Sequence, residues 1–423
     1  MSGSKPTGKS FDIDKRVVWK AYLKVVENGG APGVDGQTVD EFEQDVKNNL
    51  YKLWNRLSSG SYFPPPVKAV EIPKADGVRV LGVPTVADRI AQTVVAMTLE
   101  PLVEPAFHAD SYGYRPGRSA LGAVEACRRR RWKYDWVVDL DIKSFFDTVP
   151  HDLVLKAVEA HTDSPWVILY VKRWLEAPIQ QRDGSLAARD RGTPQGSAIS
   201  PLLANLFMHY AFDTWLSREW PSVVFERYCD DAVVHCRSET QARMVRDAIA
   251  ARLASLGLEL HPDKTRIVYC KDGNRRHTFE CTGFTFLGYD FRCRGAKDPK
   301  GEVFSSFSPA VSKKAMKAMG GEIRSWHLGR RADLSMADLA RWINPIVRGW
   351  INYYGRFYKT RLVLFLQRVN RYLMHWLTHK YKRRCRSVKR AREALAEISR
   401  VYPGWFAHWR FGAKPEGWTM GAV

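Results

Sequence analysis

The sequence lacks the features of a membrane or secreted protein. None of its 423 residues belongs to an apolar run approaching the roughly 20 residues that a helix needs to cross a bilayer. The amino-terminal stretch MSGSKPTGKS has no apolar core of the kind that a secretory signal peptide contains. We therefore expect a cytoplasmic protein with no membrane partner.

Cysteine is scarce, and its spacing does not match that of a metal-binding motif. The seven cysteines form no Cys-x-x-Cys pair, which argues against a zinc ribbon or an HNH-like metal module. An odd number of cysteines is typical of reduced thiols in a reducing compartment. We expect these side chains to behave as small buried hydrophobic groups.

Acidic residues are scarce in the last quarter of the chain. Residues 310–423 contain 24 Lys and Arg against 6 Asp and Glu, so they carry nearly all of the net charge of +21. Such an excess indicates a polyanionic partner, with nucleic acid favoured over a membrane surface. Because the chain is also too long for one hydrophobic core, we expect a mixed catalytic body followed by a basic, mainly helical appendage.

Apolar residues in the appendage recur every three to four positions over 339–354 and again over 362–376, which predicts two amphipathic helices. Most of their aromatic residues are expected to pack in a core. The interleaved cations and the basic run at 381–392 are interpreted as a surface that contacts phosphates; a merely solvated charge run is the alternative. The predicted nucleic-acid-binding residues are Arg348, Arg356, Lys359, Arg361, Arg368, Arg371, Lys382, Arg383 and Arg384.

Turn-forming residues occur in two segments of the amino-terminal body. NGGAPGVDG at 28–36 predicts a turn cluster between helical stretches. Residues 64–84 alternate apolar and polar side chains around an Asp-Gly turn, which predicts a hairpin that carries Lys74 and Arg79. Such a pair of cations is either simply solvated or forms a clamp for phosphates.

Carboxylates follow an apolar alternation in WVVDLDIKSFFDTVPHD, residues 136–152. The alternation predicts a strand with Asp139 and Asp141 on one face, and Pro150 marks the start of a helix. Taken alone, these acids could face solvent or cap a helix.

The stretch FERYCDDAVVHC, residues 225–236, sets two adjacent carboxylates between strand-forming runs. We interpret it as a hairpin whose turn holds Asp230 and Asp231, while a separate strand supplies Asp141. Three converging carboxylates repel one another unless divalent cations neutralise them, and oxygen ligands suit Mg²⁺. Two such ions about 3.5 to 4 Å apart activate a hydroxyl nucleophile and stabilise departing pyrophosphate.

Over nearly its full length the chain resembles bacterial group II intron-encoded reverse transcriptases and maturases. YCDD at 228–231 matches the Tyr-x-Asp-Asp box of that family, with Cys229 where alanine is commoner. DIKSFFD at 141–147 resembles the block that supplies the first catalytic aspartate. The further matching blocks are GAPGVDG, IPKADGVRVLGVP, SYGYRPGRSA (111–120), RGTPQGSAISPLLANL (191–206), LGLELHPDKTRIV (256–268), FTFLGYDF (284–291) and GWINYYGRF (349–357).

The resemblance implies an α+β, right-hand polymerase architecture, in which fingers and a palm with an antiparallel sheet precede an α-helical thumb. The reverse transcriptase domain would span 1–305, with an N-terminal extension and fingers at about 12–135 and the palm with remaining finger elements at about 136–305. The helical thumb or maturase domain would span 306–385, and 386–423 would be a basic segment and a candidate DNA-binding region.

The resemblance also assigns a metal site. Asp141 and Asp230 would be the principal ligands of two Mg²⁺ ions, Asp231 would complete the acidic cluster, and the backbone of Ile142 would be a further ligand. Nucleophile activation would then depend on the metal and on no Ser or His.

Nucleotide-binding roles follow from the same blocks. Lys74 and Arg79 would hold the triphosphate of an incoming dNTP. Phe146 is expected either to exclude a ribose 2′-hydroxyl as a steric gate or to be an ordinary core residue. Gln195 would contact the nucleotide or the template, or only satisfy backbone groups in its turn.

Four further titratable residues are expected to be structural. Asp139 and Asp147 flank the predicted site, where hydrogen bonding or capping is the better interpretation. His235 and His261 have no partner that the sequence identifies for acid-base chemistry.

The resemblance implies an RNA-directed DNA polymerase that binds group II intron RNA, assists its splicing, and copies it into DNA during retrohoming. Its partners would be the intron RNA, an RNA template with a DNA primer, and target DNA. The cysteine pairs of an HNH endonuclease are absent, so an endonuclease-lacking form is expected. The alternatives are a binding-only maturase with a vestigial polymerase, and a domesticated enzyme of DNA repair or phage defence.

Overall fold

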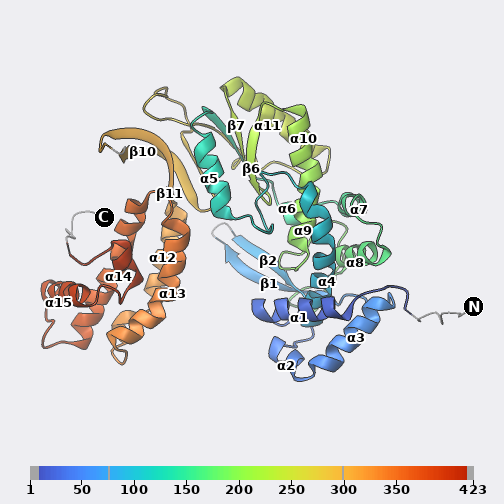
Figure 1. Cartoon of the computed structure of the whole chain (residues 1–423), viewed down its shortest axis with the longest axis horizontal. Helices are drawn as coiled ribbons and strands as arrows, with labels where there is room; N and C mark the ends of the chain where they lie inside the picture. Colours follow the sequence, from blue (N-terminus) through green and yellow to red (C-terminus); the bar gives the residue numbers. More distant parts are fainter. Residues whose placement is uncertain (1–8, 75–76, 298–299, 417–423) are drawn as a thin grey trace, which may run out of the picture. The chain divides into compact units, whose positions relative to one another are not determined.

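The computed structural model describes residues 9–74, 77–297 and 300–416. The chain forms two compact units (Figure 1). Unit 1 comprises the described residues up to Ala123 together with Val138–Arg266, and unit 2 comprises Val124–Val137 together with the described residues from Ile267 on. The domain boundaries predicted from the family blocks stay a prediction.

Unit 1 begins with helices that local sequence signals specify. The side chain of Asp14 accepts a hydrogen bond from the backbone of Arg16 and so starts the first helix. Thr38 and Glu41 form a reciprocal capping box at the start of the second. The predicted turn cluster at 28–36 lies between these helices and is confirmed. The helices are α1 (Lys15–Asn28), α2 (Val39–Gln44), α3 (Val46–Ser58) and α4 (Val86–Val103), and α1 and α3 pack against α4.

The hairpin predicted at 64–84 is confirmed. Strands β1 (Val67–Lys74) and β2 (Gly77–Val83) pair antiparallel, and Ile72 lies opposite Arg79. The strand order is β2-β1-β4-β5, completed by β4 (Ile179–Gln180) and β5 (Leu186–Ala187). Residues 75–76, which include the Asp of the predicted turn, lie outside the described residues.

A second four-stranded sheet has the order β6-β7-β3-β8. It consists of β6 (Val224–Tyr228), β7 (Asp231–Cys236), β3 (Trp136–Leu140) and β8 (Arg266–Tyr269). Both β3 and β8 contain a point where the chain passes between the units. Val137, Val138, Val233 and Val234 have no exposed surface, so burial of β-branched side chains accounts for these strands.

Further helices complete unit 1. The helix predicted after Pro150 is confirmed as α7. These elements are η1 (Glu104–Ala106), α6 (Phe145–Thr148), α7 (His151–Glu159), α8 (Pro165–Glu176), α9 (Ser200–Met208), the π-helix η2 (His209–Asp213), α10 (Thr214–Glu219) and α11 (Glu239–Ala254), while α5 (Ala120–Arg130) belongs partly to each unit.

Unit 2 combines an antiparallel sheet of order β11-β10-β9 with a helical region. Its core contains the fully buried indoles of Trp326, Trp376 and Trp409. The two predicted amphipathic helices are confirmed, since they fall within α13 and α14. The elements are β9 (Gly283–Phe286), β10 (Tyr289–Lys297), β11 (Val303–Val311), α12 (Lys313–Ser325), η3 (Leu328–Arg330), α13 (Met336–Tyr354), α14 (Lys359–Lys380), α15 (Val388–Val401) and α16 (Ala407–Phe411).

Two expectations from composition can be compared with the structure. Five of the seven cysteines are buried, but Cys281 is only partly buried and Cys293 is exposed on β10, so the expectation of uniformly buried thiols was wrong for these two. Among the described residues, no helix has the length and hydropathy of a membrane span.

Candidate active site

The acidic hairpin contains a two-residue turn. Tyr228 lies opposite Asp231 in the β6–β7 register, so Cys229 and Asp230 form the turn itself. The prediction that both acids occupy the turn was therefore wrong for Asp231, which is the first residue of β7. Cys229 has a φ of 61°, a left-handed conformation that an L-residue with a Cβ atom adopts only at a cost.

The third carboxylate, Asp141, follows the end of β3. This strand ends at Leu140 and does not include Asp141. The expectation that Asp139 and Asp141 lie on one face of a strand was therefore wrong for Asp141. The backbone carbonyl of Asp141 accepts a 2.7 Å hydrogen bond from the amide of His261. Its carboxylate lies 3.2 Å from the ammonium group of Lys264. The segment at 259–265 thus fixes both the backbone and the side chain of Asp141.

Asp141 and Asp230 lie close enough for their charges to interact. Burial raises the pKa of Asp230, and the negative charge of Asp141 raises this pKa further. The nearby guanidinium of Arg79 lowers the same pKa. Two half-buried carboxylates from separate elements therefore share one site, with a cation beside them.

The donor set suits a hard divalent cation. Asp141 and Asp230 offer carboxylate oxygens, which Mg²⁺ prefers, and a bound cation would relieve the repulsion that raises the pKa of Asp230. Asp231 is half-buried at the start of β7. Ile142 has a buried side chain, and its backbone pairs with Leu260 in an isolated bridge.

Asp139 has a different environment from these acids. Burial raises its pKa to about 7, and the positive charge of Arg266 moderates the increase while Asp141 adds to it. A carboxyl group that is partly protonated near neutral pH is a poor cation ligand. This agrees with the interpretation of Asp139 as structural.

The hairpin and the 191–206 loop meet at Arg79 and Gln195. The Arg79 side chain donates a hydrogen bond to the side-chain carbonyl of Gln195, and the amide of Gly82 donates a 2.7 Å hydrogen bond to the Gln195 backbone carbonyl. Gly196 has a φ of 115°, and a Cβ atom there would lie 2.8 Å from the carbonyl oxygen of Gly82. Two predicted nucleotide-binding residues are thus adjacent. The side chain of Lys74 lies outside the described residues.

Phe146 borders the same loop. Its backbone carbonyl accepts a 2.7 Å hydrogen bond from the amide of Thr193, and its ring is only partly buried. The neighbouring Phe145 is 2% exposed and belongs to the core. Partial burial raises the pKa of Asp147, and Arg79 lowers it, which places Asp147 beside the same cation.

The two candidate histidines are structural in their contacts. His235 is fully buried, with its Nε2 atom 2.6 Å from a carboxylate oxygen of Glu226. His261 contributes its backbone amide to Asp141. Neither contact requires proton transfer.

Sequence reasoning assigned no role to Lys264, Tyr114 or Arg227. Lys264 and Tyr114 lie in blocks that resemble the family, and Arg227 directly precedes the YCDD box. Lys264 pairs with Asp141. The ring of Tyr114 lies 5.7 Å from that of Tyr228 and is 58% exposed. The side chain of Arg227 donates a 2.8 Å hydrogen bond to the backbone carbonyl of Cys229 in the hairpin turn. Position inside a matching block was the available signal for Lys264 and Tyr114, but the residue that each of them contacts is remote in sequence.

The predicted nucleic-acid-binding residues lie in unit 2. Arg361 and Arg371 are partly buried, and the other seven side chains are exposed. Arg368 and Arg371, with Arg324 and His375, line a pocket of about 300 Å³ on α12 and α14. Among the described residues, neither Arg324 nor Arg368 forms an ion pair.

Comparisons with known proteins identify the two parts of the chain. Residues 72–291 match the family model described as reverse transcriptase (RNA-dependent DNA polymerase). Residues 316–394 match the group II intron, maturase-specific domain.

Individual relatives agree with these matches. Protein YkfC of Escherichia coli is 33% identical over 299 residues, which cover 61% of this chain and 75% of YkfC. The group II intron-encoded protein LtrA of Lactococcus lactis is 31% identical over 197 residues, or 46% of this chain and 32% of LtrA. Nuclear intron maturase 2 of Arabidopsis thaliana is 33% identical over 92 residues, or 22% of this chain and 12% of that protein.

The family match includes the Asp141 and Asp230 segments and the Arg79–Gln195 contact. The predicted α+β right-hand polymerase class is confirmed by the mixed sheets, the helical carboxyl-terminal region and this match. The chain therefore belongs to the reverse transcriptase (RNA-dependent DNA polymerase) family and carries the group II intron maturase-specific domain, which confirms the resemblance seen in its sequence blocks.

Proposed function

We propose that this reverse transcriptase joins dNTPs to a DNA primer on an RNA template, and that Asp141, Asp230 and Asp231 hold two Mg²⁺ ions for the reaction. When bound, such ions activate the primer 3′-hydroxyl and stabilise the departing pyrophosphate. The observation that carries the proposal is the shared electrostatic site of Asp141 and Asp230 beside Arg79.

The other residues of the site would bind and orient the nucleotide. Arg79 would donate charge-assisted hydrogen bonds to the triphosphate, and these strengthen as charge develops on the leaving group. Its contact with Gln195 holds both side chains in place before the nucleotide arrives, and Lys74 would supply a second cation. The partly exposed ring of Phe146 would contact the sugar and disfavour a 2′-hydroxyl.

The maturase function would use the basic surface of unit 2. Seven of the nine predicted cations there are exposed, and they would contact the phosphates of group II intron RNA, the template–primer duplex and target DNA. Recognition of structured RNA depends on shape and backbone more than on base sequence. Binding is expected to weaken steeply with salt as counterions are released. We infer that this takes place in the bacterial cytoplasm, as the bacterial relatives suggest.

Primer extension on an RNA template with dNTPs and Mg²⁺ tests the polymerase. Asp230→Asn and Asp141→Asn remove one ligand charge each with little change in shape, so extension should be lost while the template–primer still binds. Asp183→Asn is the matched control, because Asp183 is an exposed loop carboxylate of the same unit. Extension by Asp230→Asn at the wild-type rate would overturn the assignment.

A binding-only maturase makes a different prediction for the same experiment. Wild-type protein would then bind intron RNA tightly and extend no primer under any Mg²⁺ concentration. A domesticated enzyme would extend the primer normally, and the discriminating observation is whether a folded intron RNA encloses its reading frame.

A further inference from the structure

Arg227 is fully buried and uses every N–H group of its guanidinium. The Nε and Nη2 atoms donate to the two carboxylate oxygens of Asp213 at 2.7 and 2.6 Å. The Nη1 atom donates to the side-chain carbonyl of Asn205 at 3.0 Å and to the backbone carbonyl of Cys229 at 2.8 Å. The second Nη2 hydrogen bond, 2.9 Å long, goes to the hydroxyl of Ser111. Five donors thus meet five acceptors.

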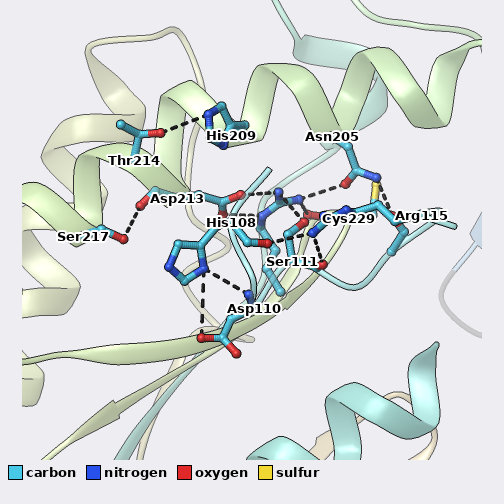
Figure 2. A network of polar contacts seen from close by, with 12 residues as sticks. His108, Asp110, Ser111, Arg115, Asn205, His209, Asp213, Thr214, Ser217 and Cys229 are labelled. Carbon is cyan, nitrogen blue, oxygen red and sulfur yellow. Dashed lines mark hydrogen bonds and ion pairs between the residues drawn. The ribbon is translucent and has the colours of Figure 1, made fainter. Parts of the chain in front are cut away.

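These acceptors come from three separate segments. Figure 2 shows Asp213 and Asn205 on the helical side, Ser111 from the loop before α5, and Cys229 from the hairpin turn gathered together. Asp213 has no exposed surface either, so the ion pair is shielded from solvent. A buried pair of this kind is costly to break, because the remaining charge has no partner.

One of the five contacts reaches a strained residue. Cys229 is the first of the two turn residues and has a φ of 61°, whereas Asp230 is not among the residues with positive φ. That pattern matches a type II′ hairpin turn, in which glycine is the usual first residue. A cysteine there carries backbone strain that surrounding contacts have to oppose.

The loop around Gly113 also packs against this turn. A Cβ atom on Gly113 would lie 2.6 Å from the backbone nitrogen of Cys229, so the loop and the turn are in close backbone contact. Asn205 holds this loop through a hydrogen bond to the Gly113 carbonyl. The backbone of Arg227 pairs with the loop as well, since its amide donates to Asp110 and its carbonyl accepts from Tyr112.

The geometry points to Arg227 as a positioning residue of the polymerase site. Asp213, Asn205 and Ser111 fix its guanidinium, which in turn binds the Cys229 carbonyl. This hydrogen bond maintains the strained turn that presents Asp230. The peptide that this hydrogen bond orients is the one joining Cys229 to Asp230, so its rotation would displace the Asp230 carboxylate. An ion pair between Arg227 and Asp213 alone would stabilise the fold without this link. The inference rests on the proposed role of Asp230.

The test is a double-mutant cycle between Arg227→Lys and Cys229→Gly, measured by single-turnover nucleotide addition. Lysine keeps the buried positive charge beside Asp213 but lacks the second terminal nitrogen that donates to the Cys229 carbonyl in Arg227. Strain of the usual size for such a residue corresponds to about a tenfold change in rate, so Arg227→Lys should lower the maximal rate about tenfold. The apparent dissociation constants for dNTP and template–primer should stay at their wild-type values.

Glycine at the turn should suppress the defect. It adopts positive φ without strain, so Arg227→Lys in the Cys229→Gly background should lose no more than about threefold in rate. A purely structural role predicts instead the same loss in both backgrounds, together with a matching loss of thermal stability. Equal losses in the two backgrounds, or a wild-type rate for Arg227→Lys, would overturn the inference.

Arg275→Lys is the matched control. The side chain of Arg275 is only 11% exposed and pairs with the carboxylate of Asp272, while its Nη1 atom donates to the carbonyls of Arg131 and Tyr134. None of these partners belongs to the turn or to the loop that Arg227 contacts, so the lysine variant should lose stability and keep the maximal rate. If it loses rate as Arg227→Lys does, the effect belongs to buried arginines in general and the inference fails.

A milder substitution provides the same test if Arg227→Lys does not fold. Ser111→Ala removes one acceptor and leaves the ion pair, and its smaller rate loss should again be suppressed by Cys229→Gly. Asp230→Asn separates this inference from the proposed function. If Asp230→Asn is active, the assignment of Asp230 fails; if it is inactive and the cycle is additive, only the positioning role fails.

Discussion

The side-chain carbonyl of Gln92 accepts a 2.7 Å hydrogen bond from the hydroxyl of Ser197. Ser197 lies two residues after the Thr193–Gln195 segment, which contacts Phe146 and Arg79. The same side-chain carbonyl of Gln92 accepts a 2.8 Å hydrogen bond from the amide of Ala198. Helix α4 therefore anchors the loop that carries Gln195. The amide of Gln92 is itself oriented by a 2.9 Å hydrogen bond to Asp88.

Asp88 is expected to make unit 1 less stable as the pH rises. Burial raises its pKa to about 6, although hydrogen bonds from Trp174, Tyr62 and Gln92 favour the charged form. The pKa of Asp88 in the folded protein thus lies above its ordinary value of 3.8. Asp88 therefore contributes its full stabilisation below pH 3.8, and this stabilisation is lost as the pH rises through about 6.

Asp88→Asn should abolish that pH dependence. The difference in unfolding free energy between wild type and variant should change by up to about 1.4 kcal/mol per pH unit across this window, as urea unfolding at a series of pH values measures. The variant should also bind dNTP more weakly. The introduced side-chain amide would face the amide of Gln92, whose carbonyl holds the Gln195 loop. Parallel stability curves for the two proteins would contradict the prediction. Asp163→Asn, at an exposed position of the same unit, serves as the control.

Phe146→Ala is expected to weaken discrimination against ribonucleotides by about ten- to a hundredfold, since a smaller side chain leaves room for a 2′-hydroxyl. The measurement is the ratio of rates over apparent dissociation constants for dNTP and rNTP. Phe145→Leu provides the comparison, because Phe145 is its buried neighbour and should cost stability alone. An unchanged ratio in Phe146→Ala would leave Phe146 as a packing residue.

Arg324 and Arg368 are expected to bind phosphates of intron RNA through the pocket on α12 and α14. Replacing either by alanine should weaken binding and reduce the slope of log affinity against log salt by about 1. Filter binding across a KCl series measures the slope. Arg341→Ala is the control, since Arg341 is exposed and already paired with Asp338; a similar change of slope there would show that general charge is responsible.

His408 is expected to make unit 2 sensitive to acid. Burial lowers the pKa of His408 to about 3, so the neutral ring, 2.9 Å from the Asn370 side-chain carbonyl, is the folded form. With a folded-state pKa below the ordinary 6.5, its contribution to stability is full above the ordinary value and is lost progressively as the pH falls toward about 3.

His408→Gln retains an N–H donor and removes the titration, so its unfolding free energy should depend less on pH below about 6.5 than that of wild type. Acid titration followed by circular dichroism measures this. His379→Gln, at an exposed position, should behave as wild type. Equal acid sensitivity of wild type and His408→Gln would rule out this histidine as the cause.

Local patterns predicted the elements well where each element depends on its own residues. The alternation at 64–84 matched β1 and β2, and the apolar spacing of 339–354 and 362–376 matched α13 and α14, because the side chains that repeat are the ones that these elements bury. In the segment at 136–152, the alternation extended the predicted strand to Asp141, whereas β3 ends at Leu140. Pairing of Asp141 with the 259–265 segment decides its conformation, and no local pattern contains that pairing.

The sequence by itself determined which groups are available: three carboxylates in two blocks, a basic carboxyl-terminal region and the residues of each amphipathic helix. Only the tertiary structure decided that Asp141 and Asp230 share a site with Arg79 and Gln195, and that Arg227 holds the Cys229 carbonyl. The physical reason is the distance along the chain over which the two kinds of interaction act. Helix and strand preferences arise among near neighbours in the chain, whereas burial, pKa shifts and buried ion pairs depend on segments that folding brings together.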